Sequence, residues 1–183
     1  MKIAIVIGST RPGRKGEAIA KWVHEQASKR TDATFEIVDV AAANLPLLDE
    51  PMPAITGKYT HDHTKAWAKT IAPFDAFVFV APEYNHGLNA ALKNAIDFLY
   101  AEWVNKAAGI VSYGANGGAR AAEQLRMVAA QLQLADVQAQ VTFSIFTDFE
   151  GNALKPAPSQ EKALTTLLDQ VVAWGSALKA LRK

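Results

Sequence analysis

The 183-residue chain is expected to form an α/β fold in which a parallel sheet is covered by helices on both faces. Near-continuous aliphatic runs, typical of strands buried on both faces, alternate along the chain with amphipathic helical segments. Turns containing glycine, proline or asparagine separate the two kinds of segment. Neither an internal repeat nor a shift in composition marks a boundary, so residues 1–183 are expected to form a single domain.

Each expected element follows from its own local pattern. The first strand is the aliphatic run KIAIVI at Lys2–Ile7, and the first helix, Glu17–Lys29, places Ile19, Trp22 and Val23 on one side. The later expected strands are Phe35–Val40, Phe74–Ala81, Ala107–Tyr113 and Val137–Phe146. The later expected helices are His61–Ile71, Asn89–Tyr100, Gly118–Leu134 and Ser159–Leu181, with Asn89 and Ser159 as capping residues. The Pro-containing stretch from Ala41 to Thr60 is expected to be a surface excursion.

The composition excludes several classes of function. Because the chain has no cysteine, it can hold no disulfide, Cys zinc site, thiolate nucleophile or Cys-ligated iron–sulfur cluster, and electron transfer would require a bound cofactor. The 19 basic and 18 acidic residues give a net charge of +1, which predicts no binding to nucleic acid or to an anionic membrane. The N-terminal run lacks the pattern of a signal peptide, so a cytoplasmic location is expected.

Three loops that follow strands carry unusual residues, and parallel sheets bind ligands beyond the carboxyl ends of their strands. The first loop, GSTRPGRKG at Gly8–Gly16, combines hydroxyls, cationic side chains and a helix N-terminus, as a phosphate site requires. It matches neither the Walker A pattern nor GxGxxG, and the alternative is a solvated basic turn. Asp39, at the end of the second strand, is expected to be an exposed carboxylate rather than a ribose ligand.

The second and third loops have simple alternatives when each is taken alone. Pro82–Gly87 contains a tyrosine and an asparagine that could hold a flat heterocycle, or it is only a turn into the next helix. Ser112–Gly118 contains three glycines that permit close backbone approach to a ligand, or only a tight turn. His61 and His63 do not predict a metal site, because side chains two residues apart on a helix point about 200° apart.

Together the three loops resemble the NAD(P)H-dependent FMN reductases, a family that includes flavin, quinone, azo-dye and chromate reductases. The resemblance is carried by GSTRPGRKGEAIAKWV, APEYNHGLNAALKNAIDFLYAEW and AGIVSYGANGGARAAEQLRMV, and it covers Lys2 to Val141. It implies a flavodoxin-like three-layer sandwich whose five-stranded parallel sheet has the order 2-1-3-4-5, with FMN as the bound cofactor.

The resemblance also implies which residues bind FMN. The phosphate side would comprise Ser9, Arg11 and the backbone of Lys15, Gly16, Glu17 and Ala18. The isoalloxazine would be lined by Pro82, Glu83, Tyr84 and Asn85. Its far side and the ribityl chain would be held by Ser112, Tyr113 and Gly114. Two departures from the family are Asn89-Ala90-Ala91, where members often carry a proline, and Gly16, where some relatives have a hydroxyl.

The implied activity is hydride transfer from NADPH or NADH to N5 of FMN, and then in a ping-pong reaction to a quinone, flavin, azo compound or metal oxyanion. The cofactor performs this chemistry, so no catalytic side chain and no metal are expected, while Tyr84, His86 and Tyr113 would shape the substrate space. A homodimer or homotetramer is implied, with contacts through Asn89–Trp103 and Arg120–Gln131. The alternatives are a flavodoxin-like electron carrier for protein partners, disfavoured by the near-zero charge, and a binding module without turnover. The sequence leaves open the choice between NADPH and NADH.

Overall fold

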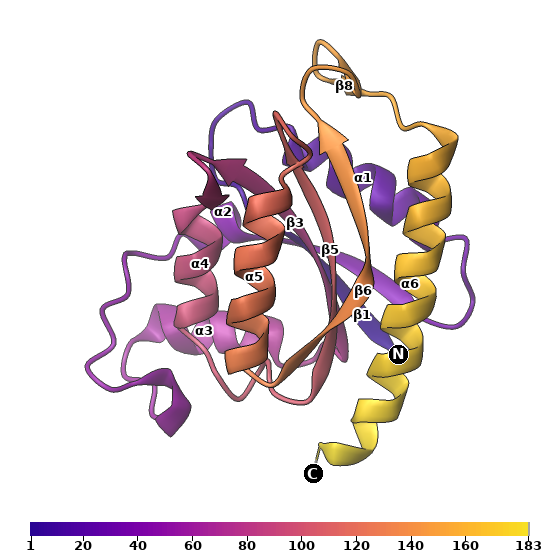
Figure 1. The fold of residues 1–183 in the computed structure, drawn as a ribbon. Helices are drawn as coiled ribbons and strands as arrows, with labels where there is room; N and C mark the ends of the chain where they lie inside the picture. Colours follow the sequence, from indigo (N-terminus) through magenta and orange to yellow (C-terminus); the bar gives the residue numbers. More distant parts are fainter. Residues whose placement is uncertain (183) are drawn as a thin grey trace.

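The computed structural model describes residues 1–182 and has a central sheet between two layers of helices (Figure 1). The long strands are all parallel and lie in the order β2-β1-β3-β5-β6, which confirms the predicted 2-1-3-4-5 order. The difference from the prediction is β4, a short strand that pairs antiparallel with β3. The strands of this sheet are β1 (Lys2–Ile7), β2 (Thr34–Asp39), β3 (Ala76–Tyr84), β4 (Gly87–Leu88), β5 (Lys106–Gly114) and β6 (Leu134–Ser144).

Helices cover both faces of the sheet, as Figure 1 shows. One face is covered by α1 (Gly16–Ala27) and α6 (Pro158–Leu178). The other face is covered by α3 (Asp62–Ile71), α4 (Ala90–Asp97) and α5 (Ala119–Gln131). The remaining short elements are α2 (Val40–Ala43), the 3-10 turns η1 (Ala54–Thr56) and η2 (Lys179–Leu181), and the hairpin strands β7 (Phe149–Glu150) and β8 (Ala153–Leu154).

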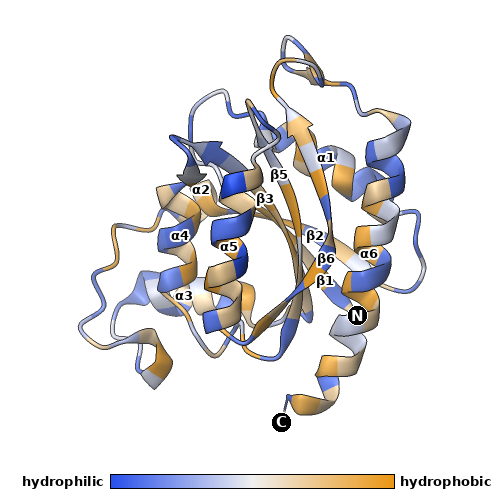
Figure 2. Cartoon of the chain, in the orientation of Figure 1, coloured by the Kyte–Doolittle hydropathy of each residue, from blue (hydrophilic) through white to orange (hydrophobic). Residues whose placement is uncertain are grey.

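Alternation along β1 explains why the core has two layers. Ile3, Ile5 and Ile7 belong to the cluster that contacts α1 and α6, whereas Ala4 and Val6 belong to the cluster on the opposite face. Side chains of a strand alternate between faces, so a strand buried on both sides shows no polar alternation. Figure 2 shows hydrophobic colouring along much of the central strands. No helix within residues 1–182 combines the length and the apolar character needed to cross a membrane.

Several local expectations were wrong at the beginnings of helices. Ala157, rather than Ser159, is the N-cap of α6, and the amide of Ala157 donates to the Gln160 side chain at 2.6 Å. Asn89 is the N-cap residue of α4, but its side chain makes no capping bond. The predicted surface excursion begins within α2, because the Asp39 side chain accepts the amide of Ala41 and so starts a short helical turn at Val40.

His61 and His63 also differ from the expectation. His61 is the N-cap of α3 and has an extended backbone, so the helical spacing argument does not apply to this pair. Their rings stack with centroids 5.2 Å apart, and His63 Nε2 lies 2.9 Å from an Asp49 carboxylate oxygen. Within residues 1–182 no cluster of three or more His, Asp or Glu side chains could hold a metal ion.

Candidate functional site

The loops that follow β1, β3 and β5 meet at one edge of the sheet, because these strands are adjacent and parallel (Figure 1). A cavity of about 370 Å³ lies between them. Its lining comprises Arg11–Lys15 from the first loop, Glu83 and Tyr84 from the second, Tyr113–Ala115 from the third, and Ile145 after β6. The structure therefore brings together residues predicted from all three loops.

The first loop begins at Gly8, whose backbone amide and backbone carbonyl are both hydrogen-bonded. Its amide donates to the carbonyl of Val80 at 3.0 Å, and its carbonyl accepts Asn89 Nδ2 at 2.7 Å. A Cβ atom at Gly8 would lie 2.7 Å from Leu92 Cδ2, so glycine is required by close packing. Asn89 thus ties the first loop to the start of α4, instead of capping α4.

Hydroxyl groups gather beneath the first loop. Ser9 is fully buried, and its Oγ lies 2.7 Å from the hydroxyl of Tyr84. Tyr113 is only 4% exposed, and a Cβ atom at Gly16 would lie 2.9 Å from its Oη. Burial raises the pKa of Tyr113 above its usual range, so the hydroxyl stays protonated. These three hydroxyls come from the three loops that line the cavity.

Arg14 belongs to the first loop, but its guanidinium is already bonded to two carboxylates and so is not available to a phosphate. It forms a two-point ion pair with Asp39, with N···O distances of 2.8 and 2.5 Å, and it donates to Glu17 at 2.9 Å. It also donates to the carbonyl of Ser9 at 2.5 Å. The prediction that Asp39 is an exposed carboxylate was therefore wrong, because its side chain is only 28% exposed and is paired with Arg14. The network holds the loop against the end of β2.

The other cations of the first loop differ in their availability. Lys15 Nζ donates to the carbonyl of Gly151 at 2.6 Å and lies 4.4 Å from the ring centroid of Phe149, so its side chain contacts the β7–β8 hairpin. Arg11 is exposed and forms no ion pair with any residue in the range 1–182. Of the three loop cations, Arg11 alone has a side chain with neither an ion pair nor a hydrogen bond to residues 1–182, whereas Lys15 has a hydrogen bond but no ion pair.

The N-terminus of α1 supplies backbone donors next to these side chains. The first intrahelical bond of the helix runs from the amide of Ile19 to the carbonyl of Lys15 at 3.3 Å. The preceding amides, those of Gly16, Glu17 and Ala18, therefore have no intrahelical acceptor. Such a group of amides, with the positive end of the helix dipole, suits a phosphate.

The second loop is a hairpin and not the simple turn into a helix that was the alternative. Tyr84 pairs with Gly87, and the two residues between them, Asn85 and His86, have φ values of 48° and 73°. Positive φ at both central residues is typical of the tight two-residue turn that suits twisted strands. Asn85 and His86 are exposed at its tip, at the edge of the sheet where the loops meet.

Glu83 lies on the cavity wall, yet its carboxylate is already bonded. One oxygen accepts the amide of Arg120 at 3.0 Å and the other accepts Arg120 Nη1 at 2.7 Å, close to the N-terminus of α5. Burial raises the pKa of Glu83, but these bonds outweigh it and hold the pKa below its usual value. The carboxylate therefore stays ionised and fixes the second loop to α5.

The third loop needs its glycines for steric reasons. Gly118 has a φ of 74°, and a Cβ atom there would lie 2.6 Å from the amide nitrogen of Tyr113. Ser112 is fully buried, and its hydroxyl donates to the carbonyl of Gly117 at 2.7 Å. The Ser112 side chain thus supports the loop from beneath and is not exposed in the cavity, whereas Tyr113 and Gly114 line it.

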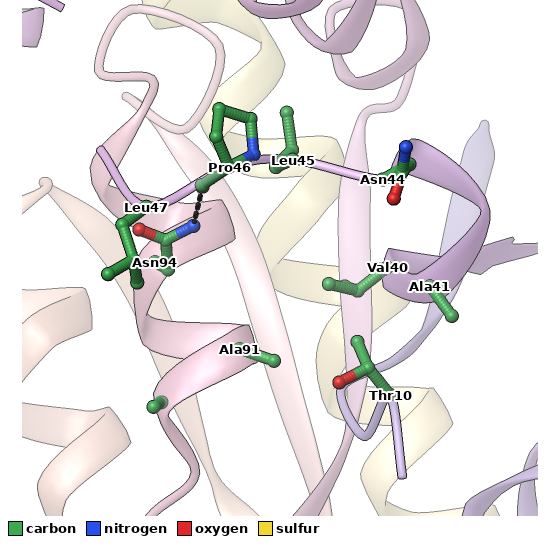
Figure 3. Close-up of a pocket in the computed structure, with 10 residues that line it drawn as sticks. Thr10, Val40, Ala41, Asn44, Leu45, Pro46, Leu47, Ala91 and Asn94 are labelled. Carbon is green, nitrogen blue, oxygen red and sulfur yellow. Dashed lines mark hydrogen bonds between the residues drawn. The ribbon is translucent and has the colours of Figure 1, made fainter. Parts of the chain in front are cut away.

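A second cavity of about 590 Å³ lies beside Thr10, between α2 and α4 (Figure 3). Its wall includes Leu45–Leu47, held by Asn94, whose side chain donates to the carbonyl of Pro46 at 2.7 Å and accepts the amide of Leu48 at 2.9 Å. No ionisable side chain lines this cavity. No local pattern predicts this cavity, because the Pro-containing stretch has no periodic repeat of apolar residues.

Comparisons with known proteins agree with this geometry. The profile of the family described as NADPH-dependent FMN reductase matches residues 1–148. An NAD(P)H-dependent FMN reductase of Schizosaccharomyces pombe is 47% identical over 135 residues, which cover 73% of this chain and 68% of that protein. A 2-hydroxy-1,4-benzoquinone reductase of a Burkholderia species is 31% identical, with 95% of this chain and 96% of that protein covered. The solved structure of FerB, a flavoenzyme NAD(P)H:(acceptor) oxidoreductase from Paracoccus denitrificans, has a similar fold, with a TM-score of 0.67, 19% identity, and 96% and 97% of the two chains covered.

Proposed function

Because the chain belongs to the NADPH-dependent FMN reductase family, we propose that it oxidises NAD(P)H and reduces a small acceptor, with a quinone as the main acceptor class. The relatives support the coarser statement, an NAD(P)H-dependent oxidoreductase with FMN as cofactor. The acceptor class and a ping-pong order, in which the oxidised nicotinamide leaves before the acceptor binds, are our additions. The observation that carries the proposal is the convergence of the three loops on one cavity.

The residues present fit FMN. The free amides at the start of α1 and the exposed Arg11 supply donors for a phosphate, and the buried hydroxyl of Ser9 lies beneath the same loop. The Asn85 side chain at the hairpin tip and the backbone around Gly114 supply polar groups for the edge of a flat ring. FMN, when bound, supplies the hydride-transfer chemistry.

The side chains therefore bind and orient, and none needs to act as a nucleophile or a general acid. Glu83, an ionisable group on the cavity wall, remains in its ion pair with Arg120. Tyr84 lines the cavity and His86 is exposed at the tip of the hairpin that follows Tyr84, and both would limit the size of the molecule that reaches the ring. Quinones are favoured as acceptors because several relatives are named for quinones, among them an NAD(P)H:quinone oxidoreductase of Solanum tuberosum that is 33% identical.

A visible spectrum of the purified protein tests the cofactor. We expect a yellow protein whose flavin absorption is bleached by anaerobic NADPH or NADH, and comparison of the two donors also measures the preference between them. A colourless protein that takes up no FMN on titration would overturn the proposal. Steady-state kinetics with benzoquinone test the reaction order, because parallel double-reciprocal lines are expected for ping-pong turnover and intersecting lines would contradict it.

The proposal extends to assembly and location. We expect a homodimer or homotetramer with contacts through residues 89–103 and α5. Exposed apolar side chains support this assembly: Met127 on α5 is 67% exposed, and Leu47 and Leu48 are exposed beside α4. Analytical ultracentrifugation tests it, and a monomer at micromolar concentration would contradict it. A single domain over residues 1–183 and a cytoplasmic location complete the proposal, and limited proteolysis and cell fractionation test these two parts.

A further inference from the structure

The hydroxyl of Tyr113 is buried in an unusual way. Within residues 1–182 it has no hydrogen-bond partner, although the residue is only 4% exposed. Buried polar groups in folded proteins nearly always have partners, so an unpaired one calls for an explanation. The neighbouring phenol, Tyr84, differs in this respect because its hydroxyl is bonded to Ser9 Oγ.

The position of this hydroxyl suggests which partner it would meet. Tyr113 Oη lies beside Gly16, the first residue of α1, where the free amides of the helix begin. It lies 2.9 Å from the point where a Cβ atom would be if residue 16 had a side chain. It therefore occupies the space next to the helix start that a short hydroxyl side chain at position 16 would fill. Tyr113 also lines the cavity between the loops.

The demand for a further donor follows from the ion pairs described above. Arg14 is bound to Asp39 and Glu17, and Lys15 is bound to the carbonyl of Gly151. A flavin phosphate at the start of α1 would therefore meet Arg11 as the one loop cation whose side chain is not already bonded, together with amides and hydroxyls. A phosphate has several acceptor oxygens, and neutral O–H donors bond to it strongly because the acceptor is charged.

We propose that Tyr113 Oη donates a hydrogen bond to the phosphate of the bound flavin nucleotide and so replaces a hydroxyl side chain at position 16. This assignment rests on the proposed function and makes Tyr113 a phosphate ligand rather than a ligand of the ribityl chain. Burial raises the pKa of the phenol above its usual range, so the hydroxyl is protonated and can donate near neutral pH.

Flavin titration of the full-length protein, stripped of cofactor, tests the assignment. For Tyr113→Phe we expect FMN to bind ~10- to 100-fold more weakly, the range for one hydrogen bond to a charged group. Riboflavin, which has the same ring and ribityl chain but no phosphate, should bind with an affinity changed less than about 2-fold. Equal weakening for both flavins, or no weakening for FMN, would overturn the assignment. Failure of the unmodified protein to bind any flavin would instead overturn the proposed function.

A pair of double variants separates the hydroxyl from the shape of the site. Gly16→Ser alone should weaken FMN binding, because the new Cβ atom would lie 2.9 Å from Tyr113 Oη. In Gly16→Ser/Tyr113→Phe that oxygen is absent and the next ring atom, Cζ, would lie at an ordinary 3.5 Å. The double variant returns a hydroxyl to the helix start, so it should recover most of the affinity that Tyr113→Phe loses.

The matched control is Gly16→Ala/Tyr113→Phe, which fills the same space without a hydroxyl. We expect no recovery of FMN affinity in this control. Recovery equal to that of the serine double variant would mean that packing, and not the hydroxyl, determines affinity, and the assignment would be wrong. Thermal unfolding of cofactor-free Tyr113→Phe guards against misfolding, and its midpoint should equal or exceed that of the parent protein because an unpaired buried hydroxyl is removed.

Discussion

Replacing Arg14 with methionine is expected to destabilise the loop after β1, because this side chain holds the loop to β2. Its guanidinium is only 9% exposed and forms a two-point pair with Asp39, which is 28% exposed. Hydrogen bonds to charged groups contribute about 1.5–3 kcal/mol, whereas the pair with the half-exposed Glu17 contributes about 0–1 kcal/mol. We expect a loss of about 2–3 kcal/mol in the free energy of unfolding.

Thermal and urea unfolding of the cofactor-free protein measure this loss. For a chain of this size each kcal/mol shifts the midpoint by about 2–4 °C, so a midpoint roughly 4–12 °C lower is expected. Arg14→Lys should recover little, because a lysine cannot form the two-point pair. Glu17→Gln is the matched control, since it removes the exposed partner and leaves the Asp39 pair in place; its cost should stay below about 1 kcal/mol.

A double-mutant cycle isolates the pair itself. Arg14→Met, Asp39→Asn and the combined variant give a coupling energy, which should exceed about 1 kcal/mol for partners in direct contact. A coupling energy below about 0.5 kcal/mol would refute the reasoning, because substitutions at independent sites are additive to within about that amount. The loop would then be held by its backbone bonds and not by Arg14.

Three further predictions concern the frame of the site. Gly118→Ala should cost roughly 2–4 kcal/mol in unfolding free energy, because its φ of 74° and its contact with Tyr113 both exclude a side chain; an unchanged urea midpoint would contradict this. Asn89→Ala should lower the thermal midpoint by a few degrees, since the Gly8 carbonyl loses a buried partner; the measurement is calorimetry, and no shift would contradict it. Burial lowers the pKa of Lys106 from 10.5 to about 8, so the buried ammonium destabilises the fold below pH 8. The free energy of unfolding should therefore increase as the pH rises from about 8 to 10.5, where the folded protein has already lost this proton and the unfolded chain has not. Lys106→Gln should therefore reduce the gain in unfolding free energy between pH 7 and pH 10 relative to the parent, and an identical gain in both proteins would contradict it.

The fold could be predicted because its signals are local and periodic. A strand buried on both faces, such as β1, has a run of aliphatic residues that a helix of similar length would interrupt with polar positions. The order of the strands followed from a resemblance that covers the three loops. The short β4 could not be predicted in the same way, because its two residues, Gly87 and Leu88, pair only after Asn85 and His86 adopt positive φ values.

The side-chain pairs of the site depend on contacts between distant residues. Arg14 meets Asp39 only because β1 and β2 are parallel and in a register that pairs Ile7 with Asp39. The same holds for Glu83 and Arg120, which lie at the end of β3 and the start of α5. Sequence motifs therefore identified the residues near the cavity, but they could not distinguish the cations that hold the loop from the one that is free.

The contact between Lys15 and Gly151 joins the part of the chain that the family profile matches to the hairpin that follows it. The family profile ends at residue 148, and the β7–β8 hairpin that carries Gly151 follows directly after it. A segment outside the shared pattern thus fixes a side chain inside it. Changes in the length or sequence of this hairpin would alter how firmly the loop after β1 is held, while the sequence of that loop stayed the same. On the proposed function, the hairpin therefore offers a place to change flavin affinity without altering a residue of the loop after β1.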